Sequence, residues 1–244
     1  MRLSKVLLKI SGEWLMGDNG ENFDAKRIHT IARTIAEVHD GTLDLCLVIG
    51  GGNLMRGAVA ARNLNLARDV ADRMGMLATV MNALCLQDAL EKCGKQTRLL
   101  SGFEMPKLCE PYIGRRAKRH LEKGRIVIFA GGLGETHFST DTTAAQRAAE
   151  MQCQALLKAT NVDGVYDRDP NRDPNARRYQ KLSFHHAMNL NDQVLDHSAF
   201  GLCASNAIRI LVFSLHDPDA LKGAINGTGR FTTVSDDAEI VFDE

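Results

Sequence analysis

The feature that most constrains this chain's fold is the regular alternation of short apolar runs with helical patterns from end to end. Six short runs consist almost entirely of apolar, often β-branched residues: 5–10, 43–49, 97–100, 125–130, 155–159 and 208–213. Strands of this kind are typical of a parallel sheet buried on both faces. The pattern therefore predicts an α/β fold, a three-layer αβα sandwich around a mainly parallel sheet, in a single domain spanning 1–244.

Two segments between the strands have helical spacing. In the first, Ile28, Ile31, Ile35 and Val38 recur on one face of a helix. The second, 72–93, carries apolar residues on nearly all sides, which predicts a helix that is either deeply buried or shared with another subunit. A third segment, 161–179, is rich in Asp-Gly, Asp-Pro and arginine, and predicts a hairpin or an excursion over the sheet edge.

Charge and cysteine content exclude several classes of protein. The 244 residues include 30 basic and 30 acidic side chains, and this balance argues against a dedicated nucleic-acid or membrane-surface binder. No run approaches 18 apolar residues, and the N-terminal stretch is interpreted as a first strand, not a signal peptide. The six cysteines form no CxxC pair, which favours reduced thiols in a cytoplasmic protein.

In doubly wound sheets, ligands bind where strands end and helices begin. At the first junction, Lys9 is followed by Ile10, Ser11 and Gly12, so an ammonium and a closely approaching backbone can meet a phosphate. The alternative is an ordinary surface lysine whose chain extends to solvent.

The second junction has three consecutive glycines, Gly50, Gly51 and Gly52, followed by Arg56. Successive N–H groups in such a loop can form an anion-binding concavity, and the arginine can clamp a phosphoryl oxygen. The alternative is a tight turn packed against a neighbouring strand. The spacing matches neither a Walker A motif nor the dinucleotide fingerprint.

The third and fourth junctions add an acid and a second lysine. At the third, Ser139 or Thr140 can cap a helix, while Asp141 can orient a lysine or a hydrated Mg²⁺. At the fourth, Lys158 ends a strand and is expected to face Lys9. Two buried ammonium groups without a fixed partner would cost several kcal/mol, which indicates a phosphate between them.

Other chemistries find less support. The basic run 115–123 is interpreted as a solvated helix face, given the neutral total charge. The histidines form no HxxxH or Cys/His cluster that would indicate zinc, and no GxSxG elbow indicates a serine hydrolase.

Taken together, the stretches 8–13, 48–56, 72–80, 119–125 and 157–166 resemble the bacterial uridylate (UMP) kinases, of the amino-acid-kinase fold family. The resemblance runs from residue 6 to about 232. It implies transfer of the ATP γ-phosphoryl group to UMP in pyrimidine nucleotide biosynthesis, with Mg²⁺ carried by ATP. It further implies a cytoplasmic homohexamer, GTP and UTP as possible effectors, and acceptor-side and ATP-side halves of about 1–150 and 151–244.

The same resemblance assigns roles to individual residues. The catalytic group is Lys9, Arg56, Asp141 and Lys158, with Asp141 the one side chain that could reach the metal. The expected ATP-binding residues are Lys9, Ile10, Ser11, Gly12, Gly52, Arg56, Thr160, Tyr166 and Asp169. The expected UMP-binding residues are Gly51, Asp72, Leu133, Gly134, Glu135, Thr136, His137, Phe138, Ser139 and Thr140. Tyr166 can stack on a base or pack as a plain aromatic.

The chain departs from the family pattern in the acceptor loop. The family usually has Gly-Thr-Gly-Asn-Pro-Phe-Phe-Thr-Thr-Asp, whereas residues 132–141 read Gly-Leu-Gly-Glu-Thr-His-Phe-Ser-Thr-Asp. The substituted residues are expected to change acceptor affinity and selectivity while leaving ATP binding little disturbed. Residues 17–24 are also atypical, which bears on effector regulation.

Two other functions are compatible with the residues. One is a kinase of the same fold for another small acid, such as acetylglutamate or glutamate; Asp72 and the following Met-Gly-Met argue against it. The other is a nucleotide-sensing regulatory protein without catalysis, suggested by the altered loop. Retention of Lys9, Arg56, Asp141 and Lys158 argues against that.

Overall fold

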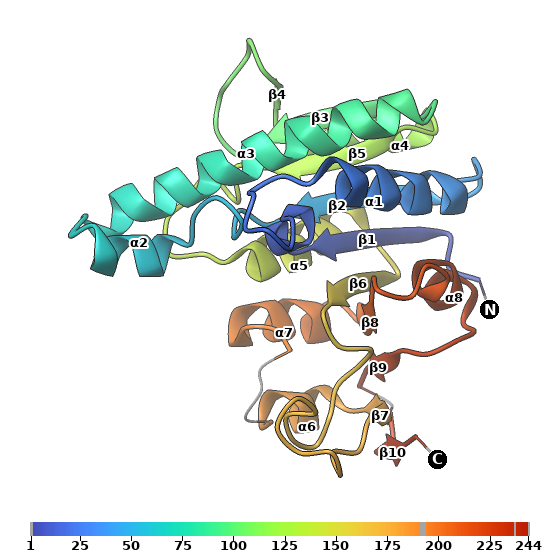
Figure 1. Cartoon of the computed structure of the whole chain (residues 1–244). Helices are drawn as coiled ribbons and strands as arrows, with labels where there is room; N and C mark the ends of the chain where they lie inside the picture. The colour runs from blue at the N-terminus through green and yellow to red at the C-terminus, as the bar shows by residue number, and fades with distance from the viewer. Residues whose placement is uncertain (1, 191–193, 237, 244) are drawn as a thin grey trace.

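A computed structural model describes residues 2–190, 194–236 and 238–243 of the chain. One ten-stranded sheet runs through them in the order β10-β7-β9-β8-β6-β1-β2-β5-β3-β4 (Figure 1). The strands are β1 Lys5–Ile10, β2 Asp44–Ile49, β3 Thr97–Ser101, β4 Glu110–Pro111, β5 Ile126–Ala130, β6 Ala155–Thr160, β7 Tyr179–Leu182, β8 Arg209–Ser214, β9 Thr232–Val234 and β10 Val241–Phe242.

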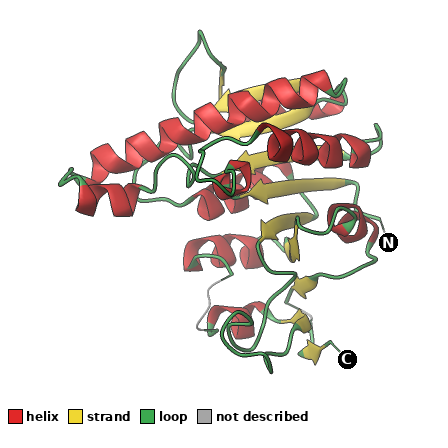
Figure 2. Ribbon diagram, in the orientation of Figure 1, coloured by secondary structure: helices red, strands yellow, loops and turns green. Residues whose placement is uncertain are grey.

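The helices lie on both sides of this sheet (Figure 2). They are η1 Gly12–Leu15, α1 Ala25–Val38, α2 Gly57–Asn63, α3 Arg68–Lys92, α4 Gly114–Glu122, α5 Thr140–Met151, α6 Phe184–Met188, α7 His197–Ser205 and α8 Ala220–Asn226. Buried residues of α1, α3 and α8 form one hydrophobic core, and buried residues of α4, α5, α6 and α7 form a second. The molecule is therefore a three-layer αβα sandwich, as predicted.

The centre of the sheet is parallel, and antiparallel pairs occur only near one end of the described sheet. Strand β1 lies between β6 and β2 and pairs with both in parallel. Strand β9 pairs antiparallel with β8, and β10 with β7. Because the central strands run the same way, their carboxyl ends meet at one edge, where the four junctions of the sequence come together.

Side-chain alternation along the central strands decides which groups share a face. In β1, Val6, Leu8 and Ile10 enter the core under α1 and α3, whereas Leu7 enters the core under α5. Lys9 alternates with Ile10, so it points to the α5 face; Lys158 reaches that face of β6 for the same reason. The period of two places both lysines on one side of the sheet.

All six predicted strands are present, and each end lies within one residue of its predicted position. The segment 161–179 is an excursion closed by an isolated antiparallel bridge between Tyr166 and Arg178. The helix predicted for 72–93 begins four residues earlier, at Arg68. Of the two alternatives predicted for this helix, deep burial on all sides is wrong for the single chain, because the Leu77 and Met81 side chains are 44% and 53% exposed.

The remaining predictions concern the surface and the thiols. The basic run forms α4, whose Ala117 and Leu121 are buried while Arg115 and Arg119 face solvent, as predicted. All six cysteines are free thiols. Among the described residues, no helix combines the length and the apolar character needed to cross a membrane.

Candidate active site

Lys9 and Lys158 meet at a single carboxylate where β1 and β6 end. The two lysines are register partners in the parallel ladder. Lys9 Nζ lies 2.7 Å from Asp141 Oδ1, and Lys158 Nζ lies 2.7 Å from Asp141 Oδ2. Lys158 also donates a hydrogen bond to the backbone carbonyl of Val194. The three charged side chains are 10%, 13% and 17% exposed, so water screens their interaction little.

The electrostatics of this cluster follow from burial and from the charges themselves. Burial alone would raise the pKa of Asp141, but the Lys9 and Lys158 ammonium groups outweigh it and hold that pKa below its ordinary value. Burial lowers the pKa of Lys158, with Lys9 adding to the effect and Asp141 opposing it. Asp141 bridges the two lysines, so they have a fixed protein partner, in keeping with the prediction that Asp141 can orient a lysine. Two ammonium groups against one carboxylate still leave one positive charge for an anion.

Asp141 is held in place by the way α5 begins. Ser139 is the N-cap: its side-chain oxygen accepts hydrogen bonds from the backbone N–H groups of Asp141 and Thr142, each at 3.0 Å. Asp196, the N-cap of α7, accepts from the Ser139 hydroxyl and, at 2.9 Å, from that of Thr142. The starts of α5 and α7 are thereby tied together, which fixes Asp141 under the two lysines.

A cavity of about 330 Å³ opens beside Lys158, here named the Tyr166 cavity. The excursion 161–179 supplies most of its wall, and β6 and β8 supply the floor. It is lined by Lys158, Thr160, Val162, Gly164, Val165, Tyr166, Arg168, Asp169, Pro170, Asn171, Val194 and Val212. The structure thus gathers Thr160, Tyr166 and Asp169, three of the predicted ATP-binding residues, around one space next to Lys158.

A second cavity, also about 330 Å³, opens beside Lys9 and is named the Asp72 cavity. It lies among the glycine loop, α3 and the loop before α5. Its lining consists of Lys9, Ser11, Gly50, Gly51, Gly52, Met55, Arg56, Gly57, Arg68, Asp72, Gly75, Met76, Thr79, Gly132, Glu135, Phe138, Ser139, Thr140 and Thr143. Since Lys9 and Lys158 share Asp141, the charged cluster lies between the two cavities.

The glycines of the two loops allow close packing around the Asp72 cavity. A Cβ at Gly12 would lie 2.5 Å from the carbonyl oxygen of Gly50, and one at Gly51 would lie 2.8 Å from that of Gly75. Neither space admits a side chain. The side-chain amide of the buried Asn82 donates a hydrogen bond to the Gly50 carbonyl at 2.6 Å, which holds the glycine loop in place.

Two arginines of the Asp72 cavity are paired with acids. Arg56 pairs with Glu13, and both side chains are partly exposed. Arg68 Nε donates to Asp72 Oδ1 at 2.8 Å, while the His137 backbone N–H donates to Asp72 Oδ2 at 2.9 Å. Burial alone would raise the pKa of Asp72, but Arg68 and the His137 N–H outweigh it and lower that pKa.

Sequence reasoning missed Arg68 and Glu13. Arg68 lies one helical turn before Asp72, and this i,i+4 spacing with an acid was a usable signal. Glu13 ends the stretch 8–13, but its pairing with Arg56 joins positions 43 residues apart and has no local signature.

Some predicted site residues line neither cavity. Ile10 lies in the hydrophobic core, and Gly12 packs beneath the glycine loop. Of the predicted UMP-binding loop, Glu135, Phe138, Ser139 and Thr140 line the Asp72 cavity, whereas Leu133, Gly134, Thr136 and His137 do not. Four residues assigned to ATP (Lys9, Ser11, Gly52 and Arg56) line the same cavity as those assigned to UMP, and of these four Lys9 contacts Asp141.

The donor set does not form a protein-built metal site. Among the described residues, no group of three or more His, Cys, Asp and Glu side chains is placed to hold an ion. Asp141 has a lysine on each carboxylate oxygen. These residues fit a magnesium ion that arrives on a nucleotide's phosphates, with the protein supplying cations and at most this single carboxylate.

The fold, with a charged cluster between two cavities at the carboxyl edge of a parallel sheet, is that of a kinase domain distinct from the Walker type. The model of the amino acid kinase family matches residues 4–214, and the chain belongs to this family.

Among its relatives, the uridylate kinase of Paramagnetospirillum magneticum is 50% identical over 97% of this chain and 98% of its own length. A uridylate kinase of Cereibacter sphaeroides is 49% identical over 94% of this chain and 93% of its own length. The crystal structure of UMP kinase from Bacillus anthracis superposes with a TM-score of 0.95 at 34% identity, covering 100% of both chains. That of UMP kinase from Ureaplasma parvum gives a TM-score of 0.90 at 36% identity, covering 96% of this chain and 100% of that one.

Proposed function

We propose that this chain is a nucleoside monophosphate kinase that transfers the γ-phosphoryl group of ATP to UMP, giving ADP and UDP. The observation that carries the proposal is the Lys9–Asp141–Lys158 cluster between two cavities of nucleotide size. The uridylate kinase relatives, matched over nearly their whole length, support UMP as acceptor over acetylglutamate or glutamate. In this assignment ATP occupies the Tyr166 cavity and UMP the Asp72 cavity.

Phosphoryl transfer requires mainly positioning and charge neutralisation, with little covalent work by the protein. Lys158 approaches the phosphates from the Tyr166 cavity and Lys9 from the Asp72 cavity. Both donate to the oxygens of the group in transit. Arg56 leaves Glu13 to bind phosphate, an exchange made easy because its side chain is 61% exposed.

Asp141 acts as the anchor of the two lysines rather than as a base. A UMP phosphate oxygen is already ionised near neutral pH, so the acceptor needs no deprotonation. Asp141 offsets the repulsion between two buried ammonium groups and keeps both aimed at the same point. Mg²⁺ bound to ATP supplies further charge neutralisation on the phosphates.

Self-association is part of the same proposal. On helix α3, the apolar side chains of Val70, Leu77 and Met81 are 43%, 44% and 53% exposed. Large apolar side chains gathered on an exposed surface are typical of a site that binds another protein. A second subunit seated on α3 would cover them. The homohexamer, regulation by GTP and UTP, and the cytoplasmic location stay predictions from the resemblance. Sedimentation velocity of the purified chain measures the assembly.

A substrate panel tests the proposed function. ADP release from ATP and Mg²⁺ is measured by a coupled assay with UMP, CMP, dUMP and acetylglutamate as acceptors. We expect the highest kcat/KM with UMP. UMP binding by calorimetry without UDP formation would favour the regulatory protein instead, and preference for acetylglutamate would favour a small-acid kinase.

A further inference from the structure

The C-terminal strand β10 lies against the back of the excursion that walls the Tyr166 cavity. It pairs antiparallel with β7, with Val241 opposite Lys181 and Phe242 opposite Tyr179. The rings of Phe242 and Tyr179 are stacked with centroids 4.4 Å apart. The family model ends at residue 214, so this strand lies beyond the part of the chain that defines the family.

A buried arginine depends on this C-terminal segment. The Arg178 side chain is 5% exposed and donates through Nη2 to the Asp243 carboxylate, while the Asp243 backbone N–H donates to the Arg178 carbonyl at 2.9 Å. Arg178 Nε and Nη1 have no hydrogen-bond partner among the described residues. Loss of the acidic partner of a buried charge is strongly destabilising locally, since water cannot replace it.

Arg178 in turn supports the cavity wall. Its backbone forms the antiparallel bridge with Tyr166. Gly164 packs on its aliphatic stem so closely that a Cβ there would lie 2.9 Å from Arg178 Cδ. Gly164 and Tyr166 both line the Tyr166 cavity. Whatever displaces Arg178 therefore moves two residues of the wall.

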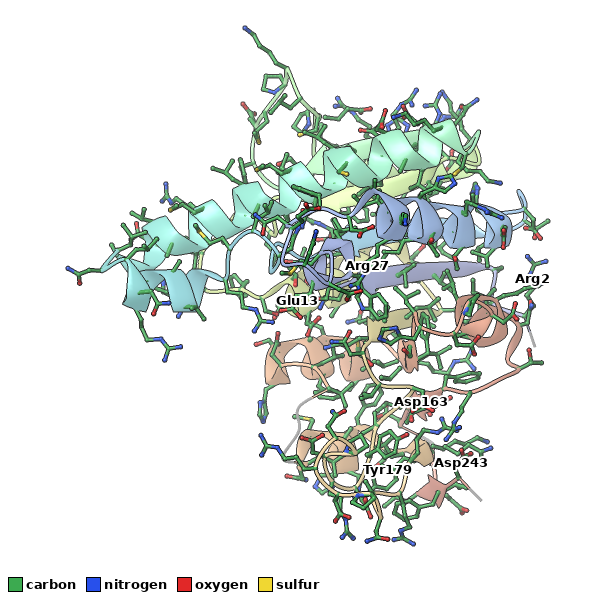
Figure 3. All side chains as sticks on the ribbon, in the orientation of Figure 1. Arg2, Glu13, Arg27, Asp163, Tyr179 and Asp243 are labelled. Carbon is green, nitrogen blue, oxygen red and sulfur yellow. The ribbon has the colours of Figure 1, made fainter. Side chains whose placement is uncertain are left out.

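A second connection runs through Arg230. Its Nε lies 2.7 Å from Asp163 Oδ2 and 3.9 Å from Asp243 Oδ2. Asp163 Oδ1 accepts the Tyr166 hydroxyl hydrogen bond at 2.6 Å. Figure 3 shows Asp163, Tyr179 and Asp243 gathered at the same end of the molecule. Asp243 thus reaches the wall both through Arg178 and, more weakly, through Arg230.

We propose that Asp243 is a positioning residue for the nucleotide in the Tyr166 cavity, holding Arg178 and hence the 163–178 wall in its binding form. The inference rests on the proposed function, because it takes this cavity to be the ATP site. If the wall samples other conformations, the apparent affinity falls by the fraction of time it is competent. The Asp72 cavity shares none of these contacts, so UMP binding stays unaffected.

The test compares three full-length variants with the wild type: Asp243→Asn, Asp243→Glu and Glu239→Gln. The last removes the same charge from an exposed position of the same segment. For Asp243→Asn we expect KM for ATP to rise about tenfold, as for a wall that is competent about a tenth of the time. KM for UMP and kcat at saturating ATP should stay within twofold. Amide hydrogen exchange of 163–178 should quicken, Asp243→Glu should restore most of the effect, and Glu239→Gln should match the wild type.

Equal rises in the KM for ATP and for UMP, or wild-type ATP KM and exchange in a folded Asp243→Asn protein, would overturn the inference. If Asp243→Asn does not fold, Arg230→Gln takes its place, because that side chain is 62% exposed and its loss spares the core. An unchanged ATP KM in Arg230→Gln would then count against the inference. Failure of the wild type to phosphorylate UMP would instead refute the proposed function, and the exchange result would still stand on its own.

Discussion

Lys9 and Lys158 stand opposite each other on neighbouring parallel strands, and both ammonium nitrogens lie 2.7 Å from the carboxylate of Asp141. Strand register and side-chain alternation place the two lysines, and the capped start of α5 places Asp141 between them. The cluster keeps one excess positive charge between the Tyr166 cavity and the Asp72 cavity. In the proposed reaction, this charge is placed to stabilise the phosphoryl group as it passes from one cavity to the other.

Replacing Asp141 by Asn should destabilise the free protein by about 3 kcal/mol, the scale for leaving buried charges without their partner. Binding of ATP should recover part of that loss, since phosphates take over the role of the carboxylate. Urea unfolding with and without ATP measures both. Asp44→Asn, which breaks the more exposed pair with Lys5, is the control and should cost less than about 1 kcal/mol.

The stabilising effect of Asp141 should also depend on pH in a defined direction. Its pKa in the folded protein is below the ordinary value of 3.8, so between these two values the unfolded chain binds more protons. The contribution is therefore complete above the ordinary pKa and is lost as pH falls through the folded pKa. We expect wild type and Asp141→Asn to differ in unfolding free energy at pH 7 and to converge in acid. A difference that stays constant into the acid range would assign the effect to packing.

Asp72→Ala should raise the KM for UMP more than that for ATP. Asp72 lines the cavity assigned to UMP and also holds the acceptor loop through the His137 N–H. If its carboxylate accepts from the ribose, UMP should lose preference relative to dUMP. Initial rates with both acceptors measure this. Equal rises for ATP and UMP, with unchanged ribose discrimination, would mean that the residue acts through packing alone.

Residues 132–141 depart from the family pattern at five positions, of which Glu135 and Ser139 line the Asp72 cavity; Ser139 keeps the hydroxyl of threonine, so Glu135 is the departure there that changes charge. Glu135 lines the Asp72 cavity, whereas Leu133, Thr136 and His137 do not. Glu135→Gln should therefore tighten UMP binding about fivefold or more, since like-charge repulsion at 4–6 Å costs about 1 kcal/mol even when it is screened as in bulk water. Calorimetric titration with UMP measures it.

His137→Asn is the matched control, because asparagine tolerates the positive φ of 69° at that position. It should leave the UMP affinity unchanged, because the His137 side chain does not line the Asp72 cavity. A change in UMP affinity for His137→Asn, or no gain for Glu135→Gln, would contradict the placement.

The sequence was sufficient to predict the strands β1, β2, β3, β5, β6 and β8 and the junctions that follow them, but not β4, β7, β9 and β10. Runs such as Ile126–Ala130 are apolar throughout and predict buried strands. A glycine run or a lysine at the end of such a strand is therefore expected at the carboxyl edge of the sheet. The contact of Asp141 with a lysine was also predictable, because a helix that starts after a glycine loop places its first turn near the carboxyl edge of the sheet, where both lysines lie.

Contacts between distant segments were not predictable in this way. Arg56 pairs with Glu13, and Arg178 pairs with Asp243. In the sequence these charged residues resemble ordinary surface residues, and only tertiary packing determines which acid each arginine meets. The path of the loop that keeps Leu133 and His137 out of the lining of the Asp72 cavity includes left-handed backbone at Gly134 and His137. Propensity does not predict such a conformation for histidine.

Single-turnover transfer with γ-³²P-labelled ATP tests the central claim most directly. In the wild type, label should pass from ATP to UDP only when UMP is present, with none on the protein. Lys9→Met and Lys158→Met should each slow this step by roughly 10²–10³-fold, the scale for losing one preorganised charge donor. Both variants should keep the wild-type melting transition and bind UMP and ATP within a few-fold of wild type. Transfer within a few-fold of the wild-type rate in either folded variant would contradict the claim that the lysines carry the reaction.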